Sequence, residues 1–111
     1  MAREAANLVY DFTSSGECAR DFGFRDQIRR AAVSVLSNIA EGFEREGDKE
    51  FLYFLSVAKG SCGEARAQLY IALDREYLTL EQFAVVKQKL LETSRRIAGL
   101  MKYLRQANPR K

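Results

Sequence analysis

Apolar side chains recur three or four residues apart over three long stretches of this chain, and this spacing limits the folds open to it. Such a period places apolar groups on one face of an α-helix. The stretches cover residues 22–45, 49–76 and 80 onwards. The single proline, in Asn108-Pro109, marks the end of the last stretch. The pattern therefore favours a few long helices over many short strands.

A shorter amphipathic segment over residues 3–13 precedes the long ones and is broken by the Ser-Ser-Gly-Glu sequence at 14–17. Glycine and acidic residues before the second long stretch predict a tight turn, with Asp48 capping the helix that follows. Thr79 and Gln82 have the spacing of a capping box, which predicts the start of the last helix. Four amphipathic helices with short connections predict an all-α, up-down-up-down antiparallel four-helix bundle with a short first helix and three long helices.

The composition argues against catalysis. The length of 111 residues is that of one domain, so residues 1–111 are expected to form a single four-helix-bundle domain. The chain has no histidine, which removes the commonest general base and the commonest zinc ligand. Its two cysteines, Cys18 and Cys62, form no CxxC metal or redox motif. We therefore expect no enzyme activity, no metal site, no cofactor and no small-molecule substrate.

No segment of the sequence predicts export or membrane insertion. The first residues lack the basic and apolar regions of a signal peptide. No apolar run approaches the roughly 18 residues of a membrane span. We therefore expect a cytoplasmic protein with reduced cysteines that makes no contact with a membrane.

Two glycines in the third predicted helix, Gly60 and Gly63, each cost roughly 0.5–1 kcal/mol relative to alanine. Close packing between helices can offset that cost. In an antiparallel pair joined near Gly47, residues whose numbers sum to about 94 lie at the same height. Ala31 then faces Gly63 and Ser34 faces Gly60, which predicts a close approach of the second and third helices.

Polar residues recur at helical spacing on a second face of the second helix, and they admit two interpretations. The first is a structural interhelical network in which Arg30 pairs with Glu64 at the same height. Its members are Arg30, Ser34, Asn38, Glu41, Gly60, Gly63 and Glu64. The second is a groove in which Glu41 and Glu64 act as acid and base. Because no histidine, metal set or phosphate-binding loop accompanies them, we favour the structural network.

Segments of the second and third helices resemble a known family. They are QIRRAAVSVLSNIAEG at 27–42, FL at 51–52, AKGS at 58–61 and Glu64. In these residues the chain is similar to the four-helix-bundle family of ribosomal RNA intervening-sequence proteins. That family also includes the accessory variability determinant proteins of diversity-generating retroelements. The resemblance is close over residues 24–77 and extends to the fourth helix by pattern alone.

The resemblance implies a small, non-enzymatic bacterial protein of the cytoplasm that assembles as a ring-like homopentamer. Some relatives, notably the retroelement accessory proteins, bind nucleic acid through a basic surface, and the resemblance extends that expectation to this chain. The chain departs from the family in two places. It has Leu36 where relatives commonly carry proline, and its first helix lacks the additional aromatic-containing turns with which relatives usually begin.

Apolar residues beyond one helix face predict self-association. Residues 51–58 are apolar nearly all round the third helix, which is more than one bundle face buries. Off the core line of the fourth helix, a second apolar stripe comprises Ala84, Val85, Leu91 and Ala98. A scatter of exposed apolar residues, normal on monomers, is the alternative. We favour a subunit interface, so the first expected partner is another copy of this chain.

The net charge of +3 is distributed unevenly along the chain. Residues 87–111 carry a net charge of +7, and residues 1–86 carry −4. The candidate contacts to RNA or DNA are the basic side chains of the fourth helix: Lys87, Lys89, Arg95, Arg96, Lys102 and Arg105. Such contacts are made to the phosphate backbone and are salt-sensitive, with little sequence readout. The alternative is a solvated helix face, its cations favoured by the helix dipole, in a purely structural or protein-interaction assembly.

Overall fold

The computed structural model describes residues 1–107 and is all-helical over that range, which confirms the predicted all-α class. This part of the chain forms five helices: α1 (Ala2–Thr13), α2 (Gly16–Arg20), α3 (Phe22–Glu44), α4 (Asp48–Asp74) and α5 (Leu80–Ala107). The helix end predicted at Asn108-Pro109 lies outside the described residues. Helix α3 passes unbroken through Leu36, as expected where proline is absent.

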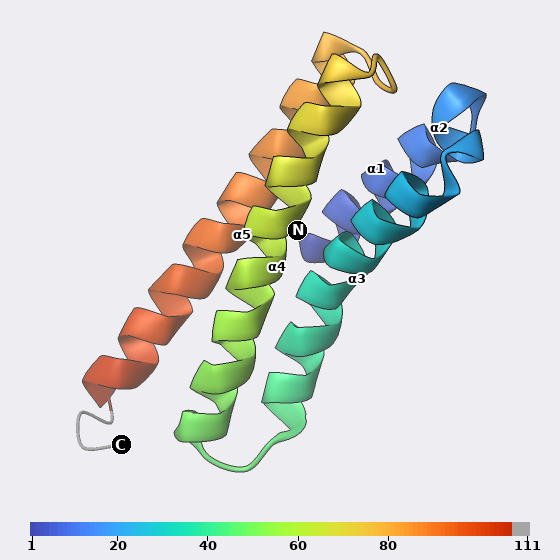
Figure 1. The fold of residues 1–111 in the computed structure, drawn as a ribbon. Helices are drawn as coiled ribbons and strands as arrows, with labels where there is room; N and C mark the ends of the chain where they lie inside the picture. The colour runs from blue at the N-terminus through green and yellow to red at the C-terminus, as the bar shows by residue number, and fades with distance from the viewer. Residues whose placement is uncertain (108–111) are drawn as a thin grey trace.

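The four longer helices pack side by side in a rod of 50 × 22 × 17 Å. Helix α3 packs along α4, α4 packs along α5, and α1 contacts both α3 and α5. Figure 1 shows the chain running alternately up and down through α1, α3, α4 and α5. Helix α1 is the shortest of these four and lies beside only the half of α3 that is nearest to α2 (Figure 1). The other half of the rod is built from three helices.

A helix of five residues, α2, occupies the segment that the sequence predicted as a simple break. Ser15 is extended, and Gly16 has a φ of +67°, a left-handed conformation that glycine adopts without strain. The turn places Cys18 in the core, where its side chain is buried. Nη1 of Arg25 donates a hydrogen bond to the carbonyl oxygen of Ala19 at 3.0 Å. The prediction was wrong here because α2 is too short to show a helical period.

Capping residues set the start of two helices. The backbone N–H of Gln82 donates to Oγ1 of Thr79 at 3.0 Å, and the backbone N–H of Thr79 donates to Oε1 of Gln82 at 2.8 Å. The predicted capping box of α5 is therefore confirmed. The N-cap predicted for α4 is wrong, because Gly47 takes that position with a φ of +89° and Asp48 is the first helical residue. There the carboxylate of Asp48 suits the positive end of the helix dipole.

The core draws side chains from all five helices of the described part, and Val9, Cys18, Ile28, Leu69 and Leu90 are among its most deeply buried members. Both cysteines are free thiols, and burial raises the pKa of the Cys62 thiol to about 11. Over residues 1–107, no helix is long and apolar enough to cross a membrane.

Helices α3 and α4 pack closely at Gly42. A Cβ atom on Gly42 would lie 2.8 Å from Cδ1 of Phe51 and 3.2 Å from Cβ of Phe54. A Cβ atom on Gly60 or Gly63 would meet no atom within 4 Å. The close approach predicted at Gly60 and Gly63 is therefore wrong, and Gly42 is the residue that permits it.

Candidate nucleic-acid interface

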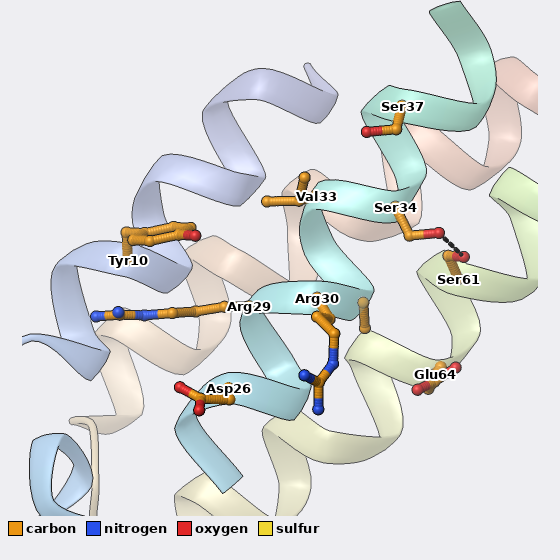
Figure 2. A pocket seen from close by; sticks show the side chains of 10 residues that line it. Tyr10, Asp26, Arg29, Arg30, Val33, Ser34, Ser37, Ser61 and Glu64 are labelled. Carbon is orange, nitrogen blue, oxygen red and sulfur yellow. Dashed lines mark hydrogen bonds between the residues drawn. The ribbon is translucent and has the colours of Figure 1, made fainter. Parts of the chain in front are cut away.

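The polar network predicted between α3 and α4 is reduced to a small half-buried cluster. The hydroxyl groups of Ser34 and Ser61 are 2.9 Å apart and share a hydrogen bond, drawn as the dashed line in Figure 2. Nδ2 of Asn38 donates to the carbonyl oxygen of Ser34 at 2.8 Å and to its Oγ at 2.9 Å. Sequence reasoning missed Ser61, although its place beside Gly60 in a helix facing Ser34 was the available signal.

The predicted ion pair between Arg30 and Glu64 is wrong. Within the described residues, Arg30 has no carboxylate within 4.0 Å, and Oε1 of Glu64 accepts a hydrogen bond from Nε2 of Gln68 at 3.4 Å. Glu41 pairs instead with Arg45 of the same helix end. Arg30, Glu41 and Glu64 are all exposed. Their charged groups are therefore solvated by water and are not buried between the helices.

An open groove of about 760 Å³ runs over the outer face of α3, and Figure 2 shows the side chains that line it. Its lining comes from α1, α3 and α4: Tyr10, Asp26, Arg29, Arg30, Ala31, Val33, Ser34, Ser37, Ser61 and Glu64. The guanidinium of Arg29 lies 4.4 Å from the centre of the Tyr10 ring, and its Nε donates to Oγ1 of Thr13 at 2.8 Å. Two cations and two carboxylates leave this groove without net charge, so it does not favour a phosphate.

The basic residues predicted on α5 lie on two sides of that helix. Lys87 lies on the α4 side, because its Nζ is 5.5 Å from the ring centre of Tyr70 in α4. Helical spacing places three further cations on that side of α5, within about 60–80° of Lys87. They are Arg95, Lys102 and Arg105, and all three are exposed.

The remaining two cations, Lys89 and Arg96, lie on the α1 side of α5. Nζ of Lys89 is 2.9 Å from Oε2 of Glu4 in α1. The hydrogen bond and the opposite charge lower the pKa of Glu4 and raise that of Lys89. Arg96, seven residues on, lines a pocket together with Met1. The six predicted residues therefore do not form one strip.

Helix α4 contributes two basic residues that sequence reasoning missed. Lys59 and Arg66 lie eleven and four residues before Tyr70, which places both on the side of α4 that faces α5. The rings of Tyr70 and Phe83 are 5.1 Å apart, so residues of α4 and α5 whose numbers sum to about 153 lie at one height. Lys59 then lies level with Arg95. The signal available in the sequence was the spacing of seven residues between Lys59 and Arg66, which places both on one face of a helix.

A second pocket, of about 410 Å³, lies beyond the N-terminal end of α1 and is largely apolar. Its lining residues are Met1, Ala2, Ile39, Phe43, Leu55, Thr93, Arg96, Ile97 and Leu100. The lining comes from the N-terminal end of α1 and from α3, α4 and α5. Figure 1 shows that α1 begins part-way along the rod. Phe43, which lines this pocket, is 66% exposed.

These features define the class of the protein: it is an all-helical protein with a basic face over α4 and α5 and an apolar pocket beyond α1. Within residues 1–107, no three His, Cys, Asp or Glu side chains are grouped so that they could hold a metal ion.

Comparison with known proteins identifies the family. The family model of the 23S rRNA-intervening sequence protein matches residues 1–99, and the chain belongs to that family. A solved structure from Bacteroides thetaiotaomicron VPI-5482, described as a protein of unknown function from the S23 ribosomal protein family, is 25% identical. Its TM-score is 0.79, and the alignment covers 91% of each chain. No curated protein matches this chain.

Proposed function

We propose that this chain is a non-enzymatic, self-associating protein of the bacterial cytoplasm, built as an up-down-up-down four-helix bundle, that binds the backbone of nucleic acid. One observation carries the proposal: α5 presents Arg95, Lys102 and Arg105 to solvent, and within the described residues none of them has a carboxylate within 4.0 Å. Cations that are not neutralised inside the protein are available to phosphates.

Binding of this kind is tested by titrating the full chain against labelled duplex and single-stranded oligonucleotides at several salt concentrations. The affinity is expected to fall steeply with salt, because each phosphate contact releases condensed counterions. The double variant Arg95→Glu/Arg96→Glu is expected to weaken binding at 50 mM salt. Arg3→Glu/Arg20→Glu, which reverses two exposed charges elsewhere, is the matched control. Undetectable binding at low salt, or equal effects of the two double variants, would refute the function.

Self-association is supported by the apolar pocket beyond α1, which a second copy of this chain would cover. The exposed aromatic residues Phe43 and Tyr53 add to the apolar surface on α3 and α4. The family resemblance suggests a homopentamer. Light scattering at micromolar concentration tests the proposal: we expect an oligomer for the parent and dissociation for Phe43→Glu. Leu80→Glu, at a residue 70% exposed at the opposite end of α5, is the control, and a monomeric parent chain rejects the proposal.

The second candidate function is a structural or protein-interaction assembly that makes no contact with nucleic acid. The observation that favours it is the number of large apolar side chains left exposed on α3, α4 and α5. An oligomer that binds no oligonucleotide at 50 mM salt is the result that selects this candidate.

A further inference from the structure

Two rows of cations face the same way along the pair formed by α4 and α5. The row on α4 comprises Lys59 and Arg66, and the row on α5 comprises Lys87, Arg95, Lys102 and Arg105. At 1.5 Å per residue, the α5 row spans about 27 Å. The two helix axes lie roughly 8–10 Å apart, as packed helices do. The result is a straight basic surface two helices wide, here called the α4–α5 surface.

Most acidic side chains lie away from the middle of the α4–α5 surface. The exception is Glu92 of α5, which is half-buried three residues before Arg95 and accepts a hydrogen bond from Nε2 of Gln88 at 3.0 Å. On α4, Glu64 lines the groove over α3, and Glu50 lies 3.9 Å from Arg45 at the end of α3. Both therefore occupy the α3 side of the helix. Helical spacing puts Asp74 and Glu81 beside the turn that joins α4 to α5, at one end of the surface. Within the described residues, no carboxylate lies within 4.0 Å of Lys59, Arg66 or Arg95.

Small residues, glycine among them, lie along the strip between the two rows of cations. Gly63 lies between Lys59 and Arg66, and a Cβ atom there would meet nothing within 4 Å. Ala98 of α5 lies between Arg95 and Lys102 and is half-buried. Leu91, also half-buried, is a larger side chain on the same side of α5, between Lys87 and Arg95.

The α4–α5 surface offers little aromatic surface for stacking bases. Tyr70 lies at its edge and is 47% exposed, but its ring packs edge-on against Phe83, and Nζ of Lys87 lies 5.5 Å from the ring centre. Tyr103 is 65% exposed, but it lies seven residues after Arg96 and hence on the α1 side of α5. Single-stranded nucleic acid depends on such stacking for much of its affinity. A duplex keeps its base faces stacked inside and presents a regular array of phosphates, one charge per about 1.7 Å of its axis.

We propose that the α4–α5 surface binds the phosphate backbone of double-stranded nucleic acid, with Lys59 and Arg66 of α4 contributing alongside Arg95 and Lys102 of α5. Lys89 and Arg96 take no part, because they lie on the α1 side. The inference rests on the proposed function, and it adds the face, the residues and the form of nucleic acid. A straight rod of 50 Å lies along a duplex without bending it.

The experiment uses the full chain and three labelled probes: a 20-base-pair DNA duplex, an RNA duplex of the same length and a 20-nucleotide oligo(dT). Fluorescence anisotropy at 50–300 mM salt gives the affinity and its salt dependence. At least one of the two duplexes is expected to bind more tightly than oligo(dT) at every salt concentration. Binding of the DNA duplex alone or the RNA duplex alone shows which groove geometry the surface fits, and either supports the proposal.

Neutral substitutions then separate the two helices and the two sides of α5. Lys59→Gln, Arg66→Gln and Arg95→Gln are each expected to weaken duplex binding roughly five- to tenfold at 100 mM salt. Each is also expected to lower the salt slope by about 1. Arg96→Gln, the same change one residue along, tests the assignment of sides and is expected to bind as the parent does. Arg20→Gln, at an exposed residue of α2, is the matched control. A thermal melt checks that each variant folds.

The outcomes distinguish this inference from the function on which it rests. If Lys59→Gln and Arg66→Gln bind as the parent does while Arg95→Gln is weakened, nucleic acid is bound and the two-helix surface is wrong. If Arg96→Gln weakens binding as much as Arg95→Gln, the assignment of sides is wrong. Tighter binding to oligo(dT) overturns the choice of a duplex. If the parent binds no probe at 50 mM salt, the proposed function itself fails.

Discussion

Replacing Gly42 by alanine tests the packing of α3 against α4 directly. The added Cβ atom would lie 2.8 Å from Cδ1 and 3.3 Å from Cε1 of Phe51. The Phe51 ring can rotate away, but the third contact, 3.2 Å to Cβ of Phe54, is close to the backbone of α4. The two helices must therefore separate slightly, or the Phe51 ring must leave its contact with Phe43.

Two opposing terms set the size of the effect. Overpacking of this kind costs roughly 1–3 kcal/mol. Alanine gains about 0.5–1 kcal/mol over glycine within a helix. We therefore expect Gly42→Ala to lower the free energy of unfolding by about 1 kcal/mol. The same change at Gly60 meets no atom within 4 Å and is expected to raise it by roughly 0.5–1 kcal/mol.

Urea unfolding followed by far-ultraviolet circular dichroism measures both variants against the parent. Because the proposed self-association would also stabilise the fold, all three proteins are compared at one concentration and again at a tenfold lower one. With a slope of roughly 1–2 kcal/mol per molar urea, the midpoints of Gly42→Ala and Gly60→Ala are expected to differ by about 1 M or more. Equal midpoints, or a more stable Gly42→Ala, would refute the close approach at Gly42.

Three further predictions concern two hydrogen-bonded pairs and one buried thiol. Lys89 lowers the pKa of Glu4, so this pair stabilises the fold above the ordinary pKa of a glutamate and is lost as the pH falls. Glu4→Gln should therefore flatten the decline of the melting temperature between pH 6 and pH 3, and an unchanged decline contradicts this. The Tyr77 hydroxyl donates to Oδ2 of Asp21 at 2.6 Å and lowers the pKa of Asp21; in Tyr77→Phe, a carbon-detected NMR titration should find that pKa raised, and no change argues against the bond. The Cys62 thiol, buried and with its pKa raised to about 11, should resist a thiol reagent at pH 8 until urea unfolds the chain, and rapid labelling of the folded protein would count against its burial.

The sequence predicted the long helices well because their length and period are local properties. The structure places α3 at Phe22–Glu44 and α4 at Asp48–Asp74, within two residues of the expected bounds. The capping box at Thr79 and Gln82 is equally local, since both hydrogen bonds close within four residues. Helix α2 could not be foreseen in the same way, because its five residues make little more than one turn.

The contacts between helices were predicted less well, because they depend on how each helix is rotated. The hydrogen bond between Ser34 and Ser61 puts the register one residue away from that expected. One residue turns a helix face by about 100°, which is enough to carry Glu64 out of reach of Arg30. The glycines show the same limit: nothing in the sequence distinguishes Gly42, which is closely packed, from Gly60, which is open.

The two sides of α5 could be assigned only from the helices that contact each side. The α1 side is linked to the proposed self-association, and the α4 side to the proposed binding of nucleic acid. On the α1 side, Arg96 borders an apolar pocket that a second copy can cover. On the α4 side, Arg95 and Lys59 lie at one height, and over the residues described neither has a carboxylate within 4.0 Å. The pocket and the α4–α5 surface lie on different sides of α5. An oligomer formed through the pocket would therefore leave the α4–α5 surface exposed in every subunit. Its summed positive field then strengthens the attraction of a duplex without any further base contact.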